Sequence, residues 1–506
     1  MTDSSGVVAE DGSESDSIDD LFQELLKGGG VAFGASLFSK AVGFVFNITL
    51  ARFLGASGYG LFVLGLTVAH FAQPVALLGL PDGIVRYVSK YRSEDRPAKV
   101  RGTVLTSIGI SAAFAVVLGA GVFLFAGELA TRVFDEPELV QILPLFGLAV
   151  PFYVLLQTST SVAVGFKRIE YQQVVRNVLF PLLKLGAVGG ALLLGYQLQG
   201  AVSGLVVAVA LASVAGVVVI PRLFTEIELR GAVDPEVSRL LRYSLPVFLS
   251  GFSYLALNQI DRLVLGAFRP SSAVGIYNAS SVLSQQGVLF FAAIVTIFNP
   301  IASDLYSSGS IERLQTVYRT VTRWILMLSF PIAVVGSLFA TELLRLFNAQ
   351  FVAGVPILVL LFGAQLLYVA VGPAGELLQM SGFQDIVLLD TVSMLVVNVV
   401  LNLLLVPRYG AIGAAVATAV SISGVQLAEL YQTKRYVGIQ PIGKRYLYIV
   451  VIGGAFAAAT YGVSLLSLSL VPRAAAAITV SAVYAALVWV FTITEEDKAT
   501  FQSFVS

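Results

Sequence analysis

The sequence predicts an all-α polytopic membrane protein with about 14 transmembrane helices. Of its 506 residues, 57% are apolar and only 12% are charged, about half the charged fraction of a typical soluble domain. Apolar runs of about 20 residues recur along the chain, long enough for membrane helices and about twice the length of a barrel strand. Cysteine is absent and there is one histidine, so we expect no disulfide and no zinc site. The formal charge of zero argues against a nucleic-acid partner.

The first 27 residues differ from the rest, because they are acidic and rich in serine. No basic stretch precedes an apolar run here, so a cleaved signal peptide is not predicted. Residues 1–16 are typical of a solvated tail. Ser17 and Asp20 resemble a capping box, and apolar residues recur after them at helical spacing. We therefore predict a short amphipathic helix from Ser17 that lies on the inner membrane face.

Fourteen spans are predicted in the remaining chain, since apolar segments of about 20 residues follow one another with short polar connections. The predicted ranges are 28–53, 58–80, 101–127, 139–166, 172–195, 200–221, 240–267, 273–301, 317–341, 353–380, 384–406, 410–433, 445–468 and 472–493. Placing both termini in the cytoplasm puts 22 of the 31 Lys and Arg residues on that side and 6 in the outer loops. This bias fits the positive-inside rule. The sequence therefore predicts a multi-pass protein of the cell (cytoplasmic) membrane with cytoplasmic N- and C-termini.

An internal repeat divides the first twelve spans into two groups of six. Pro81 and Pro300 close the second and eighth spans, and Gly165 and Gly382 lie near the ends of the fourth and tenth. Because six is even, both copies enter the membrane in the same direction, and a pseudo-twofold axis along the membrane normal should relate them. The predicted organisation is a tail with its amphipathic helix (1–27), a first lobe (28–224), a cytoplasmic linker (225–238), a second lobe (239–436), and two extra helices with a short C-terminal tail (437–506).

Three glycine-rich stretches carry a family resemblance. They are ARFLGASGYGLF after the first span, NQIDRLVLGAF with VGIYNAS around the seventh and eighth, and RYGAIGAAVATAVS at the twelfth. With the six-plus-six-plus-two arrangement, they resemble the MOP flippase superfamily, in its Wzx-type polysaccharide or lipid-linked oligosaccharide translocase branch. The resemblance covers roughly residues 28–493. It implies a MOP/MATE-like fold and an exporter that flips lipid-linked saccharides by alternating access, with a cavity between the lobes lined by spans 1, 2, 7 and 8.

Polar side chains follow one face of each of these four spans. At helical spacing they must meet protein or water, because an unsatisfied polar group in hydrocarbon costs several kcal/mol. Hydrogen bonding between helices is the simpler interpretation, above all for a lone histidine. Four stripes on equivalent helices nevertheless favour a wet cavity between the lobes. The candidate cavity residues in these stripes are Asn47, His70, Asn258, Asp261, Asn278 and Gln285.

Intramembrane cations indicate the substrate class. Lys40 lies near the middle of span 1, where a charge costs on the order of 3 kcal/mol or more. Either it pairs with an acid such as Asp261 or Asp82, or it contacts the phosphate of a lipid-linked saccharide. Arg262 has the same two interpretations, or it anchors the outer end of span 7 at the interface. Arg86 could guard the inner mouth, although the positive-inside rule explains it equally well.

Two intramembrane acids bear on energy coupling. Glu376 follows a Gly-Pro break in span 10, and Asp390 lies a turn and a half into span 11. Either carboxylate could bind Na⁺ or H⁺, whereas Asp390 could equally be a solvated residue near the inner surface. The sequence contains no nucleotide-binding loop. We therefore expect no ATP-driven step, and we expect no catalytic residue, metal or cofactor.

The leading hypothesis is a transporter of lipid-linked oligosaccharide, not an enzyme. Its partners would be the saccharide with its phosphate or diphosphate carrier, Na⁺ or H⁺, membrane lipids, and glycosyltransferases or a polymerase of the same pathway. One alternative is a MATE-type cation-coupled drug or metabolite antiporter, which a central Lys40 disfavours. Another is a non-transporting membrane scaffold or an enzyme of glycan assembly, although the short outer loops leave no room for a catalytic domain.

Overall fold

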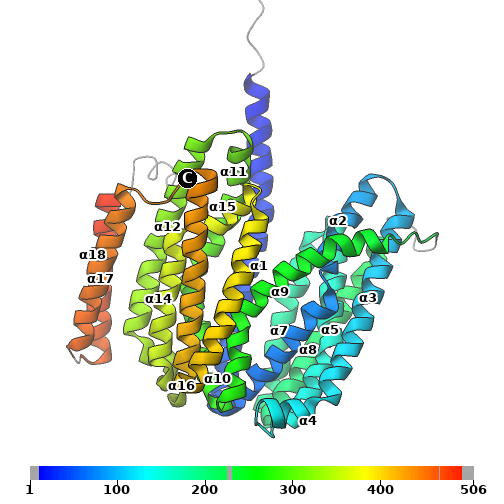
Figure 1. Cartoon of the computed structure of the whole chain (residues 1–506), viewed down its shortest axis with the longest axis horizontal. Helices are drawn as coiled ribbons and strands as arrows, with labels where there is room; N and C mark the ends of the chain where they lie inside the picture. The colour runs from blue at the N-terminus through cyan, green and yellow to red at the C-terminus, as the bar shows by residue number, and fades with distance from the viewer. Residues whose placement is uncertain (1–10, 225–230, 467, 493–506) are drawn as a thin grey trace, which may run out of the picture.

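The computed structural model describes the backbone of residues 11–224, 231–466 and 468–492, and side chains from residue 34 onward in these ranges except at 219 and 221–224. Tail residues 1–10, linker residues 225–230 and C-terminal residues 493–506 of the predicted organisation therefore lie outside the described residues. Within the described ranges the chain forms helices and no strands (Figure 1). The predicted all-α class is confirmed.

The first half of the chain builds one helical lobe. Its elements are α1 (Asp11–Leu77), α2 (Leu80–Ser93), α3 (Pro97–Leu124), α4 (Ala126–Glu128), η1 (Leu129–Val133), α5 (Leu139–Gly165), α6 (Ile169–Gln172), η2 (Gln173–Leu179), α7 (Phe180–Leu193) and α8 (Gln197–Phe224). Helices α3, α5, α7 and α8 pack against one another. Together with α2 they form the body on the right of Figure 1, whereas the upper part of α1 stands at the centre.

The second half builds a similar lobe with two additional helices. Its elements are α9 (Val237–Phe268), α10 (Ser271–Ser284), η3 (Gln285–Val288), α11 (Leu289–Ser307), α12 (Ile311–Leu338), α13 (Ala340–Arg345), η4 (Ala349–Gly354), α14 (Val355–Val371), α15 (Ala374–Met380), α16 (Gln384–Gln432), η5 (Thr433–Val437), α17 (Lys444–Leu465) and α18 (Leu470–Thr492). Helix α16 packs against α9 and α14, and α17 and α18 lie together against α12 at the outer edge (Figure 1).

Twelve apolar helices of the described residues are long enough to cross a membrane, and two of them cross twice. Gly34–Ser93 and Gln384–Val437 have 60 and 54 residues, about 90 and 80 Å of helix against about 30 Å of hydrocarbon. A non-helical glycine reverses the chain in each, Gly55 (φ 67°) within α1 and Gly410 (φ 58°) within α16. Positive φ at such a turn favours glycine because a β-carbon would clash with the backbone. The twelve helices thus give the fourteen predicted crossings.

Helix α1 differs from the prediction at its start. The sequence predicts a separate short helix from Ser17, but the only non-helical residue between Asp11 and Leu77 is Gly55. The backbone of residues 11–33 therefore continues in line with the first span, where we predicted a helix along the membrane face. Figure 1 shows this part of α1 rising above the rest of the bundle. The side of the bundle where α1 enters is called the amino-terminal side below, and the other is called the opposite side.

The two lobes are joined on the opposite side. The amide of Asn278 in α10 donates to the Tyr59 hydroxyl at 2.6 Å, and that hydroxyl donates to Asn47 Oδ1 at 2.7 Å. The Ser57 and Ser271 hydroxyls lie 3.0 Å apart. A β-carbon at Gly60 would collide with the Ser271 carbonyl, so α1 and α10 approach backbone to backbone. These contacts seal the opposite side.

The start of α9 is held by the first lobe on the amino-terminal side. Glu236, which precedes α9, accepts hydrogen bonds from the Lys99 ammonium, the Tyr91 hydroxyl and, at 3.2 Å, the Arg239 guanidinium. The hydrogen bonds from Lys99 and Tyr91 lower the pKa of Glu236 to about 2. The Asp234 amide also donates to the Ala98 carbonyl at 3.1 Å. Helix α9 therefore starts against the first lobe and ends in the second, which Figure 1 shows as a diagonal.

Candidate functional site

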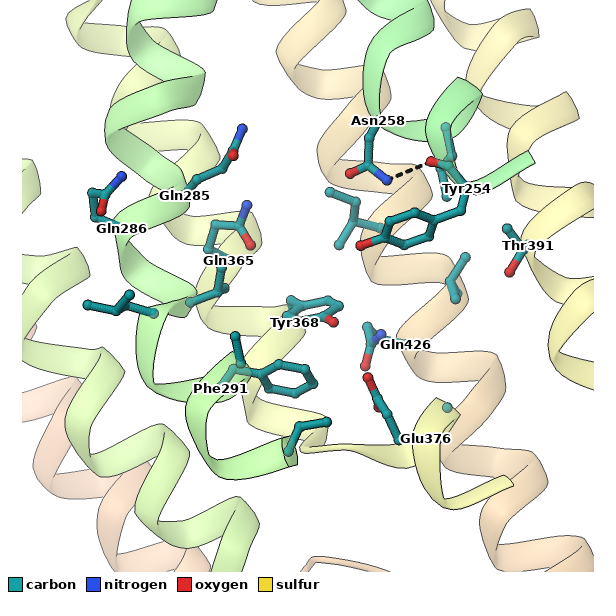
Figure 2. A pocket seen from close by; sticks show the side chains of 18 of the residues that line it. Tyr254, Asn258, Gln285, Gln286, Phe291, Gln365, Tyr368, Glu376, Thr391 and Gln426 are labelled. Carbon is teal, nitrogen blue, oxygen red and sulfur yellow. Dashed lines mark hydrogen bonds between the residues drawn. The ribbon is translucent and has the colours of Figure 1, made fainter. Parts of the chain in front are cut away.

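A cavity of about 720 Å³ lies between α1 and the second lobe. Its volume is within the ~300–1,000 Å³ range of small-molecule sites. Helix α1 supplies one wall, and α9, α10 to α11, α14, α15 and both halves of α16 supply the rest. Figure 2 shows the polar side chains of several of these helices pointing into one space. We call this space the second-lobe cavity.

Uncharged hydrogen-bonding groups dominate the polar lining of the second-lobe cavity. Seven side-chain amides line it: Asn47, Asn258, Gln285, Gln286, Gln365, Gln379 and Gln426. The hydroxyls of Tyr254, Tyr368 and Thr391 join them. An amide offers donors and acceptors together, and tyrosine adds an apolar ring beside a hydroxyl. This combination is suited to a ligand with many hydroxyl groups.

Three charged side chains also line the second-lobe cavity: Lys40, Glu376 and Glu429. Lys40 is exposed to the cavity, and no carboxylate among the described residues lies within ion-pair distance of it. The alternative pairing of Lys40 with Asp261 or Asp82 is therefore not formed in this structure. An unpaired ammonium on a cavity wall can bind an anion.

Glu429 is the most enclosed of these charged groups, with 5% of its surface exposed. Its carboxyl packs against α15, where a β-carbon on Gly375 would lie 2.7 and 2.8 Å from its two oxygens. The Gln426 amide donates to Glu429 at 3.3 Å. Glu376 follows Gly375 directly and points toward Gln426 in Figure 2. Two carboxyls and one amide thus meet at the amino-terminal end of the cavity.

Five of the candidate residues from the sequence lie in the lining of this cavity: Lys40, Asn47, Asn258, Gln285 and Glu376. Asn258 also donates to the Tyr254 carbonyl at 2.7 Å, and Gln285 donates to the Ser281 hydroxyl at 3.2 Å. Four of them are cavity candidates from spans 1, 7 and 8, and Glu376 of span 10 is the ion-coupling candidate.

Asp261 and Asn278 lie outside the lining, which corrects their placement in the cavity. Asp261 is 3% exposed and accepts hydrogen bonds from the Tyr277 hydroxyl and, at 3.4 Å, from the Thr418 hydroxyl. Its carboxylate therefore bonds within the second lobe. Asn278 is 6% exposed and bonds to Tyr59 across the lobe interface. Both side chains are used in packing, as the simpler interpretation of polar stripes allowed.

Arg262 and His70 also lie outside the two cavities described here, at the interface of the lobes. The Nδ1 atom of His70 lies 3.4 Å from the Gln259 side-chain oxygen, and its ring meets the edge of Tyr153. Arg262 is half-buried, and its Nε has no hydrogen-bond partner among the described residues.

Arg86 and Asp390 lie outside the cavity lining as well. Arg86 is exposed on α2 and stacks over the Tyr243 ring at 4.3 Å, so it ties α2 to α9 on the amino-terminal side. Asp390 accepts a hydrogen bond from the Gln432 amide at 2.9 Å, and its second oxygen is buried without a partner. Asp390 is therefore packed between the two halves of α16 and is not an ordinary solvated residue.

A second, smaller pocket of about 240 Å³ lies in the first lobe. Its lining includes Arg176 and Lys184, with Gln73, Gln157 and Asn177. The Lys184 ammonium lies 4.3 Å from the centre of the Phe46 ring, an attraction that offsets part of its desolvation. No carboxylate among the described residues lines this first-lobe pocket. The pocket is therefore basic.

Sequence reasoning missed lining residues on spans 8, 10, 11 and 12. The residues missed are Gln286, Gln365, Tyr368, Gln379, Thr391, Gln426 and Glu429. A signal was present, since Ile422, Val425, Gln426 and Glu429 recur at i, i+3, i+4 and i+7 on one helix face. The basic residues that follow span 12 predict an interfacial position for Glu429. In the structure its side chain is buried instead.

No cluster of three or more His, Cys, Asp or Glu side chains among the described residues could hold a metal ion. The acids of the second-lobe cavity are too few for such a centre, and its amides are weaker ligands. The chemistry that this lining can perform is binding through hydrogen bonds, single charges and protons.

Comparison with known proteins identifies related sequences. The family model described as "Polysaccharide biosynthesis protein" matches residues 25–306, more than half of the chain, and the MatE model matches 246–404. The "Probable flippase AglR" of Haloferax volcanii is 24% identical over 415 residues, covering 79% of this chain and 81% of the relative. The "Probable low-salt glycan biosynthesis flippase Agl15" of the same organism is 24% identical over 200 residues, covering 39% and 42%.

A solved structure has the same fold. The "Lipid II flippase MurJ, inward closed conformation" superposes with a TM-score of 0.71 at 14% identity, and the match covers 90% of this chain and 98% of that one. At this identity the likeness concerns the arrangement of helices alone. The predicted arrangement of two six-helix lobes and two further helices is confirmed by this match and by the fourteen crossings.

Proposed function

Because the chain belongs to the polysaccharide biosynthesis protein family of the MOP superfamily, we propose that it is a flippase of lipid-linked oligosaccharide that works by alternating access. The coarser statement, a multi-pass membrane transporter, already follows from the family and the fold. The finer proposal names the substrate. It is carried by one observation, the seven amides that line the second-lobe cavity.

The amide-rich lining supports a saccharide as the transported group. A sugar must lose its hydration shell to enter a cavity, and each hydroxyl then needs a donor or acceptor in return. The seven amides and three hydroxyls supply these without a fixed charge. A cavity for an apolar lipid tail would lack them, so the tail of the proposed substrate stays in the bilayer.

The cations of the two pockets support a phosphate on the same substrate. Lys40 stands unpaired on the wall of the second-lobe cavity. The first-lobe pocket adds Arg176 and Lys184 without a carboxylate among the described residues of its lining. Lysine and arginine bind phosphate oxygens through charge-assisted hydrogen bonds. A phosphate or diphosphate carrier held between the lobes would meet both sets of charges.

The seal on the opposite side supports the direction of access. In this state the Asn278–Tyr59–Asn47 hydrogen bonds and the Ser57–Ser271 contact close that side. The bias of Lys and Arg favours the amino-terminal side as cytoplasmic. The proposed cycle loads the substrate from the cytoplasm, breaks this seal, and releases the saccharide outside the cell. Glycosyltransferases or a polymerase of the same pathway are the proposed partners.

The test is the lipid content of a strain that lacks the gene. We expect saccharide-loaded carrier to accumulate and surface glycan to fall, and wild-type protein to reverse both. Lys40→Ala should restore less than a tenth of the wild-type effect, because about 1.5–3 kcal/mol of charged hydrogen bonding is lost. Lipids are quantified by mass spectrometry. The matched control is Lys444→Ala, an exposed cation outside both pockets.

Two results would contradict the proposal. If the deletion strain has an unchanged pool of saccharide-loaded carrier, the lipid-linked saccharide is not the substrate. If Lys40→Ala and Lys444→Ala rescue the strain equally, Lys40 does not contact the anion. The proposed flippase function is unaffected by that result. Both proteins must be present at wild-type levels in the membrane, which immunoblotting checks.

A second candidate function is a MATE-type cation-coupled exporter of drugs or metabolites. Glu376 and Glu429 favour it, because two carboxyls in the same cavity could hold an organic cation. Lys40 in that cavity opposes it by repulsion. If the deletion strain loses efflux of cationic dyes and keeps its normal lipid-linked saccharides, this candidate replaces the first.

A further inference from the structure

We propose that Glu376 and Glu429 hold a single proton between them through the side-chain amide of Gln426, at the amino-terminal end of the second-lobe cavity. This inference rests on the transport function proposed above and names its coupling ion. The sequence had indicated Glu376 as an ion site with Na⁺ and H⁺ as equal alternatives. The structure adds Glu429 and Gln426 and favours the proton.

Two of the three side chains are buried, and Glu376 beside them is half-buried. Glu429 and Gln426 are 5% and 7% exposed, and they lie on adjacent positions of the same face of α16. The Glu429 carboxyl is in contact with the backbone of Gly375, the residue before Glu376. All three line the second-lobe cavity, so water and ions reach them through it.

The amide of Gln426 requires one proton on the pair. Its nitrogen donates to Glu429 at 3.3 Å, and its oxygen is buried without a donor among the described residues. Figure 2 shows that oxygen directed at the carboxyl of Glu376. An amide oxygen and an ionised carboxylate are both acceptors, and a proton on the carboxyl turns their repulsion into a direct hydrogen bond. If the amide is rotated by 180°, its oxygen faces Glu429 instead, and Glu429 is then the carboxyl that needs the proton.

No cation offsets the two carboxyls. Neither Glu376 nor Glu429 has a Lys or Arg partner within ion-pair distance among the described residues. Two enclosed carboxylates that are both ionised repel each other strongly, and such pairs keep one proton. A proton satisfies the amide oxygen and removes one negative charge at once.

The other titratable groups near Glu376 and Glu429 do not share or neutralise the proton proposed for this pair. Asp390 is bonded to Gln432, and Tyr318 and Tyr446 donate to backbone carbonyls at 2.8 and 3.0 Å. Tyr254, Tyr368 and Lys40 line the same cavity, and Lys40 has no ion pair with either carboxyl. The elements packed against α15 also carry Asp304, Asp385, Lys434 and Arg435, all exposed.

Protonation changes the charge of the cavity by one unit. A proton leaves hydronium in the cavity water and bonds to a Glu376 carboxyl oxygen, whose O–H then donates to Gln426. The pair carries two negative charges before this step and one after it. Because the same cavity presents Lys40 to an anionic substrate, proton binding reduces repulsion of the phosphate, and each ligand favours the other.

Infrared spectroscopy of the full chain in lipid nanodiscs tests the inference without any saccharide. We expect a C=O stretching band of one protonated carboxylic acid at pH 7, where exposed carboxyls with ordinary pKa values near 4 have ionised. The band should be lost in both Glu376→Gln and Glu429→Gln, because a single remaining carboxylate receives amide donors and needs no proton. Asp304→Asn is the matched control and should keep the band.

The outcomes separate this inference from the proposed function. A wild-type protein with no such band at pH 7, or a band that survives both glutamine variants, overturns the proton site. Loss of the band on replacing K⁺ by Na⁺ overturns it in favour of a sodium site. If one variant does not fold, the other still decides. A failure of lipid-linked saccharide to bind leaves the band unchanged, and the proposed function alone then falls.

Discussion

The two pockets of the molecule have opposite charge although they occupy lobes of the same fold. Arg176 and Lys184 line the first-lobe pocket, and no carboxylate among the described residues accompanies them. The second-lobe cavity is lined by Glu376 and Glu429, and its one cation, Lys40, comes from α1 of the first lobe. A repeated backbone therefore does not imply repeated chemistry. The difference supports our proposal of anion binding by the first lobe and proton binding by the second.

Helix α1 forms the wall between these two pockets. Ser39 lines the first-lobe pocket, and the next residue, Lys40, lines the second-lobe cavity. Successive residues of a helix point about 100° apart, so one helix can present side chains to both spaces. A rotation of α1 would therefore alter both pockets together. This arrangement gives a physical route by which a proton in one lobe affects an anion in the other.

The largest expected effect comes from locking the seal that both pockets share. The chain has no cysteine, so Ser57→Cys with Ser271→Cys introduces a single pair at a site where the hydroxyls are 3.0 Å apart. Oxidation should abolish flipping of lipid-linked saccharide in proteoliposomes, and reduction should restore it. Either single cysteine variant is the control. Full activity of the oxidised pair would contradict alternating access through this seal.

Removing the cations of the first-lobe pocket should have the next largest effect. Arg176→Ala with Lys184→Ala should weaken binding of a phosphate-linked saccharide by roughly 10–100-fold, the loss expected for a charged hydrogen bond. Binding of the same saccharide without phosphate should be unchanged. Microscale thermophoresis of the purified protein measures both. An equal loss for the two ligands would contradict the assignment of this pocket to the anion.

Removing one amide from the second-lobe cavity should have a smaller effect with the reverse selectivity. Gln365→Ala should weaken saccharide binding by roughly 2–10-fold, the range of one neutral hydrogen bond, and the effect should not depend on the phosphate. Gln315→Ala in α12, outside both pockets, is the control. If the effect appears only with the phosphorylated ligand, the cavity does not bind the sugar.

The smallest expected effect concerns the attachment of α9 to the first lobe. The hydrogen bonds from Lys99 and Tyr91 lower the pKa of Glu236 to about 2. A lowered pKa in the folded state stabilises the protein above the unfolded pKa of about 4.5, and the gain is lost as the pH falls toward 2. Glu236→Gln should therefore lower the melting temperature slightly at pH 7 and converge with wild type only as the pH approaches 2. A constant difference would contradict the ionic origin.

The sequence was a good guide to the fold for identifiable reasons. Apolar segments long enough to cross a membrane gave every crossing, and Gly55 and Gly410 provide the reversals that short polar connections required. The start of α1 could not be settled, because an amphipathic pattern fits a helix along the membrane as well as one continuing into a span. Nothing in a local pattern distinguishes these two directions.

The candidate site was harder to predict from sequence patterns than the fold. Helical spacing identifies a polar face, but it does not say which neighbour that face meets. Asp261 and Asn278 have the same signal as Asn258, yet they bond to Tyr277 on the next helix and to Tyr59 in the other lobe. The basic residues that follow Glu429 in the sequence made an interfacial position the simpler prediction for it. Only tertiary contacts separate a cavity wall from a helix interface.

The central claim is that this chain binds a lipid-linked saccharide through a basic first-lobe pocket and an amide-lined second-lobe cavity. Native mass spectrometry of the protein purified from its own membranes tests it most directly. We predict a co-purified lipid that carries both phosphate and sugar in the wild type, and its loss in Arg176→Ala with Lys184→Ala. A wild-type protein free of such a lipid, or equal occupancy in the double variant, would contradict the claim.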